Sequence, residues 1–370
     1  MIHILIGTRA QLIKMAPVIT EVERRKMPVK LIMTGQHQET MREILNDFGV
    51  DSSPIWLHAG QEINGLGQVL PWFYKCLKAL TSSNTLLSSG RENVILVHGD
   101  TFSTLLGAVA GRMRGLCVAH VESGLRSFRI FHPFPEELTR LAVFRFSKIA
   151  FCPDDWSFNN LRKYSLDKIN TKGNTLLDAL RMALILQKNP PFPMPDGKFG
   201  VVSLHRFENI FFRKRFEMIL ELLDAVADRY QLVFVMHPPT RKNLERFGFL
   251  NRLMNNPRFH LFSRMGYFEF VTLLDRCAFV VTDGGSNQEE LSYLGKPTLL
   301  MRQATERQDG LGRNAVLSNY DVKVVEKFIE NLDVTGDSQR SINLPETSPS
   351  AMIVDYLQEM KGRTALRKRE

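Results

Sequence analysis

The sequence predicts an α/β fold in which two doubly wound parallel sheets each carry helices on both faces. Short apolar segments of strand length alternate with helical segments along the 370 residues, as in consecutive βαβ units. The alternation stops at a proline-rich segment, residues 188–197, and then starts again. Because proline disfavours both helix and central strand, this segment indicates a linker. We expect domains over residues 1–187 and 188–349, and a C-terminal segment, 350–370, whose helix packs back on the first domain.

The first half contains segments typical of strands that are buried on both faces. Each is short, rich in Val, Ile and Leu, and followed by glycine or polar residues. They lie at Ile2–Ile6, Val29–Met33, Val94–Val97, Leu116–Val121 and Ile149–Cys152. Apolar residues at helical spacing occupy Lys14–Arg25, Thr40–Phe48, Leu66–Leu87 and Thr101–Arg114. Thr40 is a candidate N-cap, and Pro71 is expected to interrupt the longest helix.

The second half repeats this alternation after the linker. Strands are expected at Phe199–Leu204, Leu232–Met236, Phe279–Thr282 and Thr298–Met301. Helices are expected at Lys214–Tyr230, Thr240–Met254, Asn287–Leu294 and Ser350–Met360. Strands joined through helices pair in parallel, so the carboxyl ends of the strands in each half should share one edge of a sheet.

Composition narrows the class of protein. Hydrophobic residues make up 44% and charged residues 24% of the chain, which is ordinary for a globular protein. The net charge of +9 suits an anionic partner, but the basic residues are scattered and no nucleic-acid-binding signature is present, so we expect no nucleic acid partner. The basic tail, 367–369, is interpreted as solvated, with weak contact to a membrane surface as the alternative.

Other features of the sequence indicate the compartment. No apolar run reaches the roughly 18 residues that a membrane span needs, and the N-terminus does not resemble a signal peptide. The four cysteines form no CxxC pair, which favours free thiols in a reducing environment. We therefore expect a cytoplasmic protein without a membrane span.

Three acidic residues in the first half are candidates for proton transfer. Glu122 lies in the run HVESGLRS after a predicted strand, Asp100 lies in VHGDTFST after another, and Glu136 lies in FHPFPEEL. A carboxyl group in a closed site can act as a general acid or base. A helix N-terminus is the alternative, since Pro135 suits a first turn and Asp100 could cap the helix that follows it. The sequence leaves both interpretations open.

Basic side chains accompany these acids. Arg9 ends the turn after the first strand, Lys14 follows in the first helix, and Arg126 lies in the HVESGLRS run. The amides of a helix N-terminus bind anions, and Arg9 and Lys14 would add positive charge there. The turn matches neither GxGxxG nor a Walker A motif. A plain surface turn remains the alternative.

The second half carries a glycine-containing loop between a strand and a helix. Gly284 and Gly285 would let the backbone approach a ligand closely, Ser286 could bind a phosphate, and Glu290 could accept hydrogen bonds from ribose hydroxyls. A helix that is simply capped by Asp283 or Ser286 is the alternative.

Histidine and arginine side chains end neighbouring strands of the same half. His205 and Arg206 follow one strand, His237 follows the next, and Arg302 and Arg307 follow the last. Together they indicate a pocket for an anion. The chain contains no metal-ligating motif of the HExxH or Cys/His type and no GxSxG elbow, so we expect neither a metal nor another cofactor.

Taken in order, these motifs resemble those of the non-hydrolysing UDP-N-acetylglucosamine 2-epimerases. The matching segments read GTR…IKMAPV, TGQH, VHGDT, HVESGLRS, PFPEE, GNTLLDAL, HRFEN, QEEL…LGKP and MRQATER, and they span nearly the whole chain. The resemblance implies two Rossmann-like domains of the GT-B type with an interdomain cleft, the nucleotide being held mainly by the C-terminal domain. It also implies a homodimer that acts on a UDP-sugar.

The reaction that the resemblance implies is C2 epimerisation of UDP-N-acetylglucosamine to UDP-N-acetylmannosamine. It proceeds by anti elimination of UDP and re-addition through a 2-acetamidoglucal intermediate. The implied catalytic residues are Asp100, Glu122, Glu136 and His205. The implied substrate-binding and UDP-binding residues are Arg9, Lys14, Arg126, His237, Gly284, Gly285, Ser286, Glu290 and Arg307. Gln36, Glu39 and Arg206 match positions near an allosteric UDP-sugar site.

Two departures from the family pattern leave the sugar and the allosteric activation open. The family reads GTRPE where this chain has Ala10-Gln11 after Arg9, and the family's Ser-Gly-Gly loop is Gly284-Gly285-Ser286. The alternatives are a hydrolysing epimerase that releases N-acetylmannosamine and UDP, an epimerase for a modified UDP-sugar, a GT-B glycosyltransferase and a UDP-sugar sensor without activity.

Overall fold

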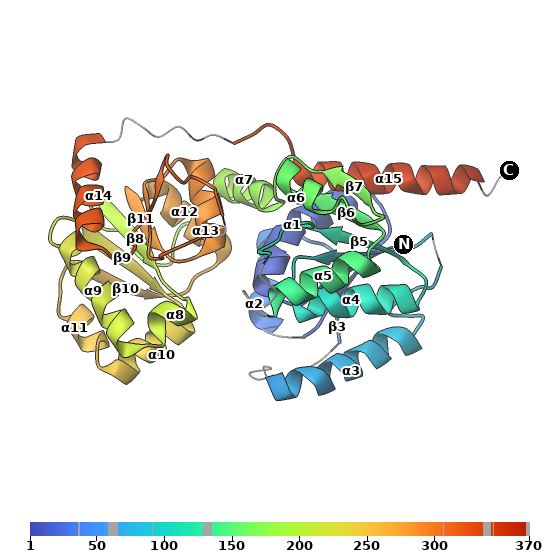
Figure 1. Ribbon diagram of the computed structural model, residues 1–370, viewed down its shortest axis with the longest axis horizontal. Coiled ribbons are helices and arrows are strands. Elements are labelled where there is room, and N and C mark those ends of the chain that lie inside the picture. The colour runs from blue at the N-terminus through green and yellow to red at the C-terminus, as the bar shows by residue number, and fades with distance from the viewer. Residues whose placement is uncertain are drawn as a thin grey trace. The chain divides into compact units, whose positions relative to one another are not determined.

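The computed structural model describes residues 1–35, 38–57, 66–90, 92–128, 135–305, 307–335, 342 and 344–367. The chain forms two compact units (Figure 1). Unit 1 contains Met1–Ala179 and Pro345–Glu370, and unit 2 contains Leu180–Leu344. Each is an α/β unit around a parallel sheet, which confirms the predicted fold class. The domain limits expected from the sequence remain a prediction.

The sheet of unit 1 has the strand order β3-β2-β1-β4-β5-β6-β7. Its strands are β1 Ile2–Ile6, β2 Val29–Met33, β3 Ile55–Trp56, β4 Val94–His98, β5 Cys117–Val121, β6 Ile149–Cys152 and β7 Asp167–Asn170. All five residues of β1 are buried, because parallel strands are covered by helices on both faces. In register, Ile4 of β1 lies opposite Leu31 of β2 and Leu96 of β4.

Helices cover both faces of this sheet. They are α1 Arg9–Arg24, α2 Gln38–Asp47, α3 Leu66–Ser82, α4 Phe102–Met113, α5 Glu136–Phe146, α6 Asp155–Asn160, α7 Leu176–Leu186, which runs past Ala179 into unit 2, and α15 Pro349–Arg367. Side chains of α3 and α4 share one hydrophobic core with β1, β2, β4 and β5. Helix α4 approaches β4 so closely that a Cβ atom on Gly107 would lie 2.6 Å from Val97. This contact explains the small residues of α4.

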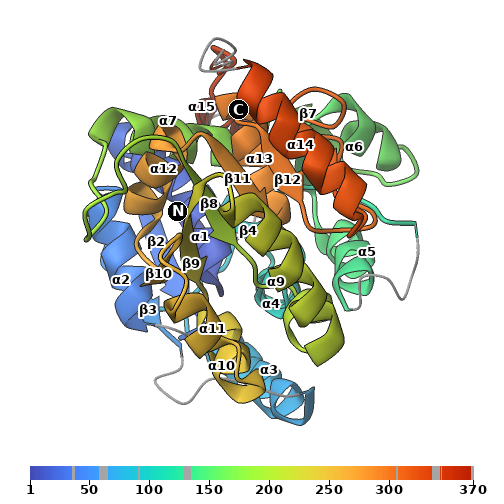
Figure 2. The same cartoon turned by 90° about the vertical axis from the view of Figure 1, so that its left-hand side faces the viewer.

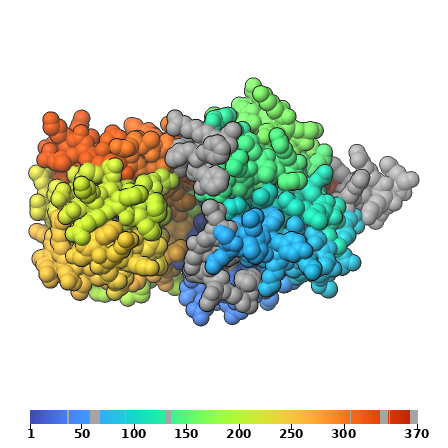
Figure 3. Space-filling view, turned by 60° about the horizontal axis from the view of Figure 1, so that its bottom comes forward, coloured from blue at the N-terminus to red at the C-terminus, as the bar shows by residue number. Residues whose placement is uncertain are grey.

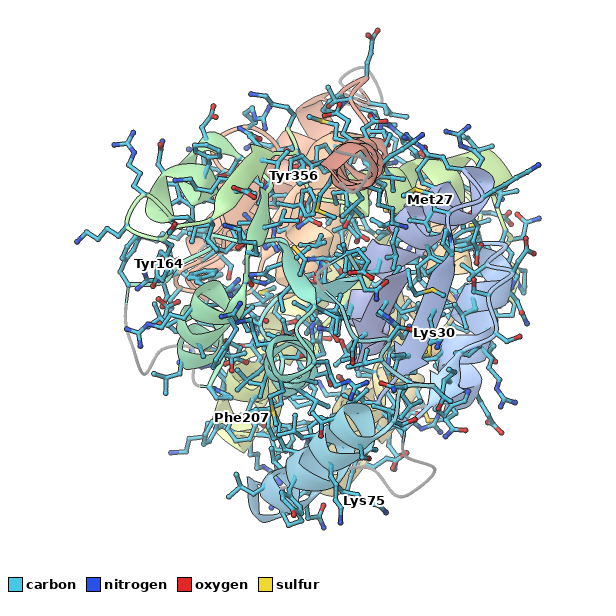
Figure 4. All side chains as sticks on the ribbon, turned by 90° about the vertical axis from the view of Figure 1, so that its right-hand side faces the viewer. Met27, Lys30, Lys75, Tyr164, Phe207 and Tyr356 are labelled. Carbon is cyan, nitrogen blue, oxygen red and sulfur yellow. The ribbon has the colours of Figure 1, made fainter. Side chains whose placement is uncertain are left out.

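The C-terminal helix α15 packs on unit 1 against α1. Arg25, the C-cap of α1, forms an ion pair of 2.5 Å with Asp355. The ring of Tyr356, labelled in Figure 4, lies 5.8 Å from that of Phe151 in β6. Helix α3 carries the exposed side chains of Leu70 and Tyr74 at the surface of the same unit (light blue in Figure 3).

The sheet of unit 2 has the strand order β10-β9-β8-β11-β12-β13. Its strands are β8 Phe199–Ser203, β9 Gln231–Met236, β10 Phe259–Ser263, β11 Phe279–Thr282, β12 Thr298–Leu300 and β13 Ala315–Leu317. Its helices are α8 Phe207–Ile210, α9 Arg213–Ala227, α10 Pro238–Phe247, α11 Leu250–Met254, α12 Tyr267–Arg276, α13 Gly285–Leu294 and α14 Val322–Thr335. Helices α9 and α14 lie side by side and share the main core with this sheet (Figure 2).

Several local expectations from the sequence are wrong. Helix α1 starts at Arg9 with Thr8 as its N-cap, and α2 starts at Gln38, so Thr40 lies inside α2. Helix α3 continues through Pro71. The helix expected over Thr240–Met254 is divided into α10 and α11, because Gly248 adopts a left-handed conformation with φ 78° and ends α10.

Candidate active site

In both units the strand order reverses next to the first strand, which is where ligands bind in doubly wound sheets. In unit 1 this point lies between β1 and β4, and in unit 2 between β8 and β11. Arg9 begins the helix that follows β1, and the loops after β4 and β5 carry Asp100 and Glu122. The predicted residues of the first half therefore gather at the carboxyl edge of one sheet.

Gln11 ties the two loops at the switch point of unit 1. Its Oε1 accepts hydrogen bonds from the backbone N–H groups of Gly7 (2.9 Å) and Thr8 (3.1 Å) after β1. Its Nε2 donates to the carbonyl oxygen of His98 (2.6 Å), at the end of β4, and to the hydroxyl groups of Thr101 and Thr104. Thr101 rather than Asp100 is the N-cap of α4, which leaves the Asp100 carboxylate for another contact.

Glu122 is the most firmly held carboxylate of this edge. Its Oε1 accepts a hydrogen bond of 2.5 Å from Lys14 Nζ and another from Asn174 Nδ2. The side chains of Lys14 and Glu122 are only 7% and 9% exposed, so this is a buried ion pair. Glu122 also has φ 59°, a conformation that few residues other than glycine adopt. Such strain persists where the surrounding structure fixes it, as at functional sites.

His98 faces the second oxygen of Glu122. Its Nε2 lies 3.5 Å from Glu122 Oε2, and its side chain is 3% exposed. Burial lowers the pKa of His98 to about 3, although the negative charge of Glu122 acts to raise it. The imidazole is therefore neutral at physiological pH. Burial also lowers the pKa of His120, whose Nε2 lies 2.8 Å from the Gly99 carbonyl oxygen, to about 4. Both histidines support the β4 and β5 loops without carrying charge.

Asp100 belongs to a chain of ion pairs with two arginines. Arg140 Nη2 donates to Asp100 Oδ2 (2.5 Å), and Arg140 Nη1 lies 3.4 Å from Glu137 Oε2. Arg126 Nε donates to Glu137 Oε1 (2.5 Å). Burial opposes ionisation of Glu137, but hydrogen bonds from the Ser127 N–H and Arg126, together with both arginine charges, lower its pKa. Arg126 therefore anchors a buried carboxylate, and its expected contact with substrate remains a prediction.

Glu136 occupies the first position of α5, after the N-cap Pro135. A carboxylate there is stabilised by the helix dipole, as expected from the sequence. Its Oε2 is buried and has no hydrogen-bond partner among the described residues. Glu39 has an exposed side chain in the first turn of α2, and Gln36 lies outside the described residues.

Asp283 organises the corresponding edge of unit 2. It directly follows β11 and is completely buried. Its carboxylate accepts hydrogen bonds from the backbone N–H groups of His205 (3.0 Å) and Arg206 (3.0 Å), after β8, and from Asn209 Nδ2 (2.9 Å). Gly284, and not Asp283 or Ser286, is the N-cap of α13. The carboxylate that the sequence suggested as a helix cap thus joins two loops.

The two predicted histidines of unit 2 stack on each other beside this carboxylate. The rings of His205 and His237 lie 4.7 Å apart at 32°. His205 Nδ1 is 3.3 Å from Asp283 Oδ1, while 38% of the His205 side chain is exposed. A Cβ atom on Gly284 would lie 2.9 Å from Cε1 of His205. The glycine at position 284 therefore leaves room for the imidazole.

The remaining predicted residues of unit 2 lie on α13 or after β12, except Arg206, which follows β8. Gly285 starts α13, and Ser286 exposes its side chain in the first turn. Glu290 is only 2% exposed, and its negative charge adds to burial in raising the pKa of Tyr267 well above the ordinary range. Arg307 Nη1 forms a 2.5 Å ion pair with Glu289, and Arg206 forms one of 2.9 Å with Glu208.

Reasoning from the sequence missed residues that hold the predicted ones in place. Gln11, His98, Asn174 and Asp283 all contact a predicted residue or its loop. Gln11 lies in the first turn of α1, and His98 and Asp283 lie at or directly after the end of a strand, places that do not reveal the partner. Asn174 lies between β7 and α7, a place without such a signal in the sequence. Among the described residues, no group of three or more His, Cys, Asp or Glu side chains could hold a metal ion. No helix in that part of the chain is long and apolar enough to cross a membrane.

Comparisons with known proteins agree with this geometry. Residues 20–346 match the sequence model of a family described as UDP-N-acetylglucosamine 2-epimerase. The chain is 31% identical to the UDP-N-acetylglucosamine 2-epimerase of Methanococcus maripaludis over 350 residues, which are 90% of this chain and 91% of that protein.

Two crystal structures are similar over nearly the whole chain. One is the Methanocaldococcus jannaschii UDP-GlcNAc 2-epimerase in complex with UDP-GlcNAc and UDP, with 25% identity and a TM-score of 0.80 over 97% of this chain and 99% of that chain. The other is the Neisseria meningitidis UDP-GlcNAc 2-epimerase bound to UDP-GlcNAc, with 26% identity, a TM-score of 0.80 and the same coverage. The likeness includes the GT-B-like pair of Rossmann-like domains.

Proposed function

The chain belongs to the UDP-N-acetylglucosamine 2-epimerase family, and from this membership we propose that it converts UDP-N-acetylglucosamine to UDP-N-acetylmannosamine without hydrolysis. The observation that carries the proposal is the buried Glu122, held by Lys14 and Asn174 at the carboxyl edge where Asp100 follows the neighbouring strand β4. The UDP-GlcNAc complexes of the similar structures support the substrate class.

The reaction needs a proton to leave C2 on one face of the sugar and to return on the other. In the proposed first step a carboxylate takes the C2 proton, the C–H electrons form a C1=C2 double bond, and the C1–O bond breaks to release UDP. The product is 2-acetamidoglucal. UDP then adds back at C1 while a different acid delivers a proton to the opposite face of C2. No water is consumed, and atoms and electrons balance over the cycle.

Because the proton leaves one face of C2 and returns to the other, the reaction requires at least two proton-transfer groups. Unit 1 supplies three carboxylates. Glu122 has a fixed position, with one oxygen bound by Lys14 and Asn174 and the other facing a neutral His98. Asp100 forms an ion pair with Arg140, and Glu136 has a buried oxygen at a helix N-terminus. We propose Glu122, Asp100 and Glu136 as the groups that move protons, because positioned carboxylates can exchange a proton with carbon when water is excluded.

Departure of UDP needs positive charge and hydrogen-bond donors near the diphosphate. We propose that His205, His237 and the loop from Gly284 to Ser286 hold the UDP, with Glu290 at the ribose and Arg307 as a further substrate-site arginine. Arg9 and Lys14 remain predicted substrate-binding residues. Glu290 is buried, so ribose binding there would require nearby side chains to move. The homodimer, the cytoplasmic location and the allosteric positions Gln36, Glu39 and Arg206 remain predictions.

Proton and phosphorus NMR of the purified protein with UDP-N-acetylglucosamine in D₂O tests this function. UDP-N-acetylmannosamine with deuterium at C2 is the expected product, since the abstracted proton exchanges with solvent. Free N-acetylmannosamine and UDP would instead show the hydrolysing reaction. Glu122→Gln should abolish deuterium incorporation while UDP binding persists, and normal exchange in that variant would remove Glu122 from the mechanism.

A further inference from the structure

One side of the His205 imidazole faces the carboxylate of Asp283, which several hydrogen bonds hold in place. Asp283 is completely buried, and its carboxylate accepts hydrogen bonds from the N–H groups of His205 and Arg206 and from Asn209 Nδ2. Asn209 is itself fixed, because its Nδ2 also donates to the Met301 carbonyl oxygen and its Oδ1 accepts from the Tyr320 hydroxyl group. The carboxylate therefore cannot turn without breaking several hydrogen bonds in a buried region.

The same carboxylate faces one particular nitrogen of the imidazole. Asp283 Oδ1 lies 3.3 Å from His205 Nδ1. A carboxylate beside one ring nitrogen favours the tautomer that carries hydrogen on that nitrogen. We propose that Asp283 is a positioning residue that keeps His205 as the Nδ1–H tautomer and leaves Nε2 as the nitrogen that meets the ligand. The inference rests on the proposed function only in taking that ligand to be the diphosphate of UDP.

Two further contacts fix the plane of the ring. The Cε1 atom of His205 occupies the place where a side chain at Gly284 would begin, at 2.9 Å from a Cβ atom built there. The ring of His237 lies 4.7 Å away at 32°. Gly284 is thus a second positioning residue, since any side chain at this position would displace the imidazole.

This arrangement defines where a proton can reside. In the neutral ring Nδ1 carries the hydrogen and Nε2 carries the lone pair. Protonation therefore takes place at Nε2 and gives an imidazolium whose Nε2–H can donate to a phosphoryl oxygen, while Nδ1–H stays directed at Asp283. A group of this kind stabilises the negative charge that develops on a departing diphosphate.

The experiment is ¹⁵N NMR of histidine-labelled protein at a pH at which the ring is neutral, with His205→Gln used to assign the signal. The wild-type protein should show His205 with hydrogen on Nδ1, and UDP should shift its Nε2 resonance. In Asp283→Asn, the amide keeps an oxygen for the backbone donors and turns its NH₂ towards Nδ1, so the hydrogen should move to Nε2. Asp224→Asn, which alters an exposed ion pair with Arg252 on the same unit, should leave the tautomer unchanged.

The kinetic companion is turnover of UDP-N-acetylglucosamine. Asp283→Asn should lower kcat by about tenfold, which is less than the roughly hundredfold lower limit for loss of an acid–base group because the imidazole itself remains, and should change KM by less than about threefold. A wild-type His205 with hydrogen on Nε2 would overturn the inference even if the variant failed to fold. The inference would also be overturned if folded Asp283→Asn kept its hydrogen on Nδ1, or if that variant lost kcat and UDP affinity by the same factor. The Nδ1–H form in a protein that does not turn over any UDP-sugar would refute the proposed function and leave the inference standing.

Discussion

Replacing Lys14 by methionine tests the buried ion pair on which the proposed site depends. Lys14 Nζ and Glu122 Oε1 lie 2.5 Å apart, and the two side chains are 7% and 9% exposed. Removing one partner leaves a buried carboxylate without its cation, which costs about 3–5 kcal/mol in proteins. Asn174 still donates to the same oxygen in the variant, so we expect the free energy of unfolding to fall by about 3 kcal/mol.

Thermal and urea denaturation measure this loss. A change of about 3 kcal/mol should lower the Tm of a unit of this size by about 6–12 °C. Lys78→Met, at an exposed position on α3, is the matched control and should change stability by less than about 0.5 kcal/mol.

A double-mutant cycle with Glu122→Gln gives the result that would refute the reasoning. In the double variant neither charge is buried alone, so its loss should be smaller than the sum of the single losses by about 2 kcal/mol or more. Additive losses would show that the two side chains do not form a buried pair in solution. A Tm of Lys14→Met within 1–2 °C of wild type, roughly what a surface substitution gives, would have the same meaning.

Three further predictions follow from other buried polar groups. Gln11→Leu should lower the free energy of unfolding by about 2–4 kcal/mol in urea, since the N–H groups of Gly7 and Thr8 lose their acceptor; a loss below about 1 kcal/mol would show that water replaces it. Lys296→Met should lower Tm because the buried ammonium donates to the carbonyl oxygens of Asp275 and Cys277 at the C-terminal end of α12, and an unchanged Tm would contradict that contact. Glu137 has a lowered pKa, so its stabilisation is present above its unfolded pKa and is lost as pH falls through the folded one. Glu137→Gln should be less stable than wild type at neutral pH, and the deficit should shrink as pH falls below 4.5; a deficit that does not change with pH would refute the charge argument.

The sequence predicted those parts of the fold that have strong local signals. Strands such as Ile2–Ile6 are continuous apolar runs because the sheet buries both faces, and the structure has them at the same residues. Asp100 and Glu122 were placed correctly after strands for the same reason. Strands β3 and β7 gave no such signal, because they are short edge strands whose residues are partly exposed.

Contacts within the site depend on strand order, which local patterns do not contain. Lys14 and Glu122 are 108 residues apart, and they meet only because β4 lies between β1 and β5 in the sheet. Asp283 and His205 are 78 residues apart and follow neighbouring strands β11 and β8. The motif around Asp283 was therefore compatible with a helix cap until the sheet placed the β8 loop beside it.

The two units hold their switch points with the same device, although their sequences do not repeat. In unit 1 the loop after β1 presents two consecutive N–H groups, of Gly7 and Thr8, to a buried Gln11 that also binds the end of β4. In unit 2 the loop after β8 presents two consecutive N–H groups to a buried Asp283 at the end of β11. The two residues differ in charge. Gln11 is a neutral amide near side chains that already include an anion and several cations, whereas Asp283 is a carboxylate beside a histidine. The charge that Asp283 adds can therefore act on the imidazole as well as on the backbone, and Gln11 can act only on the backbone.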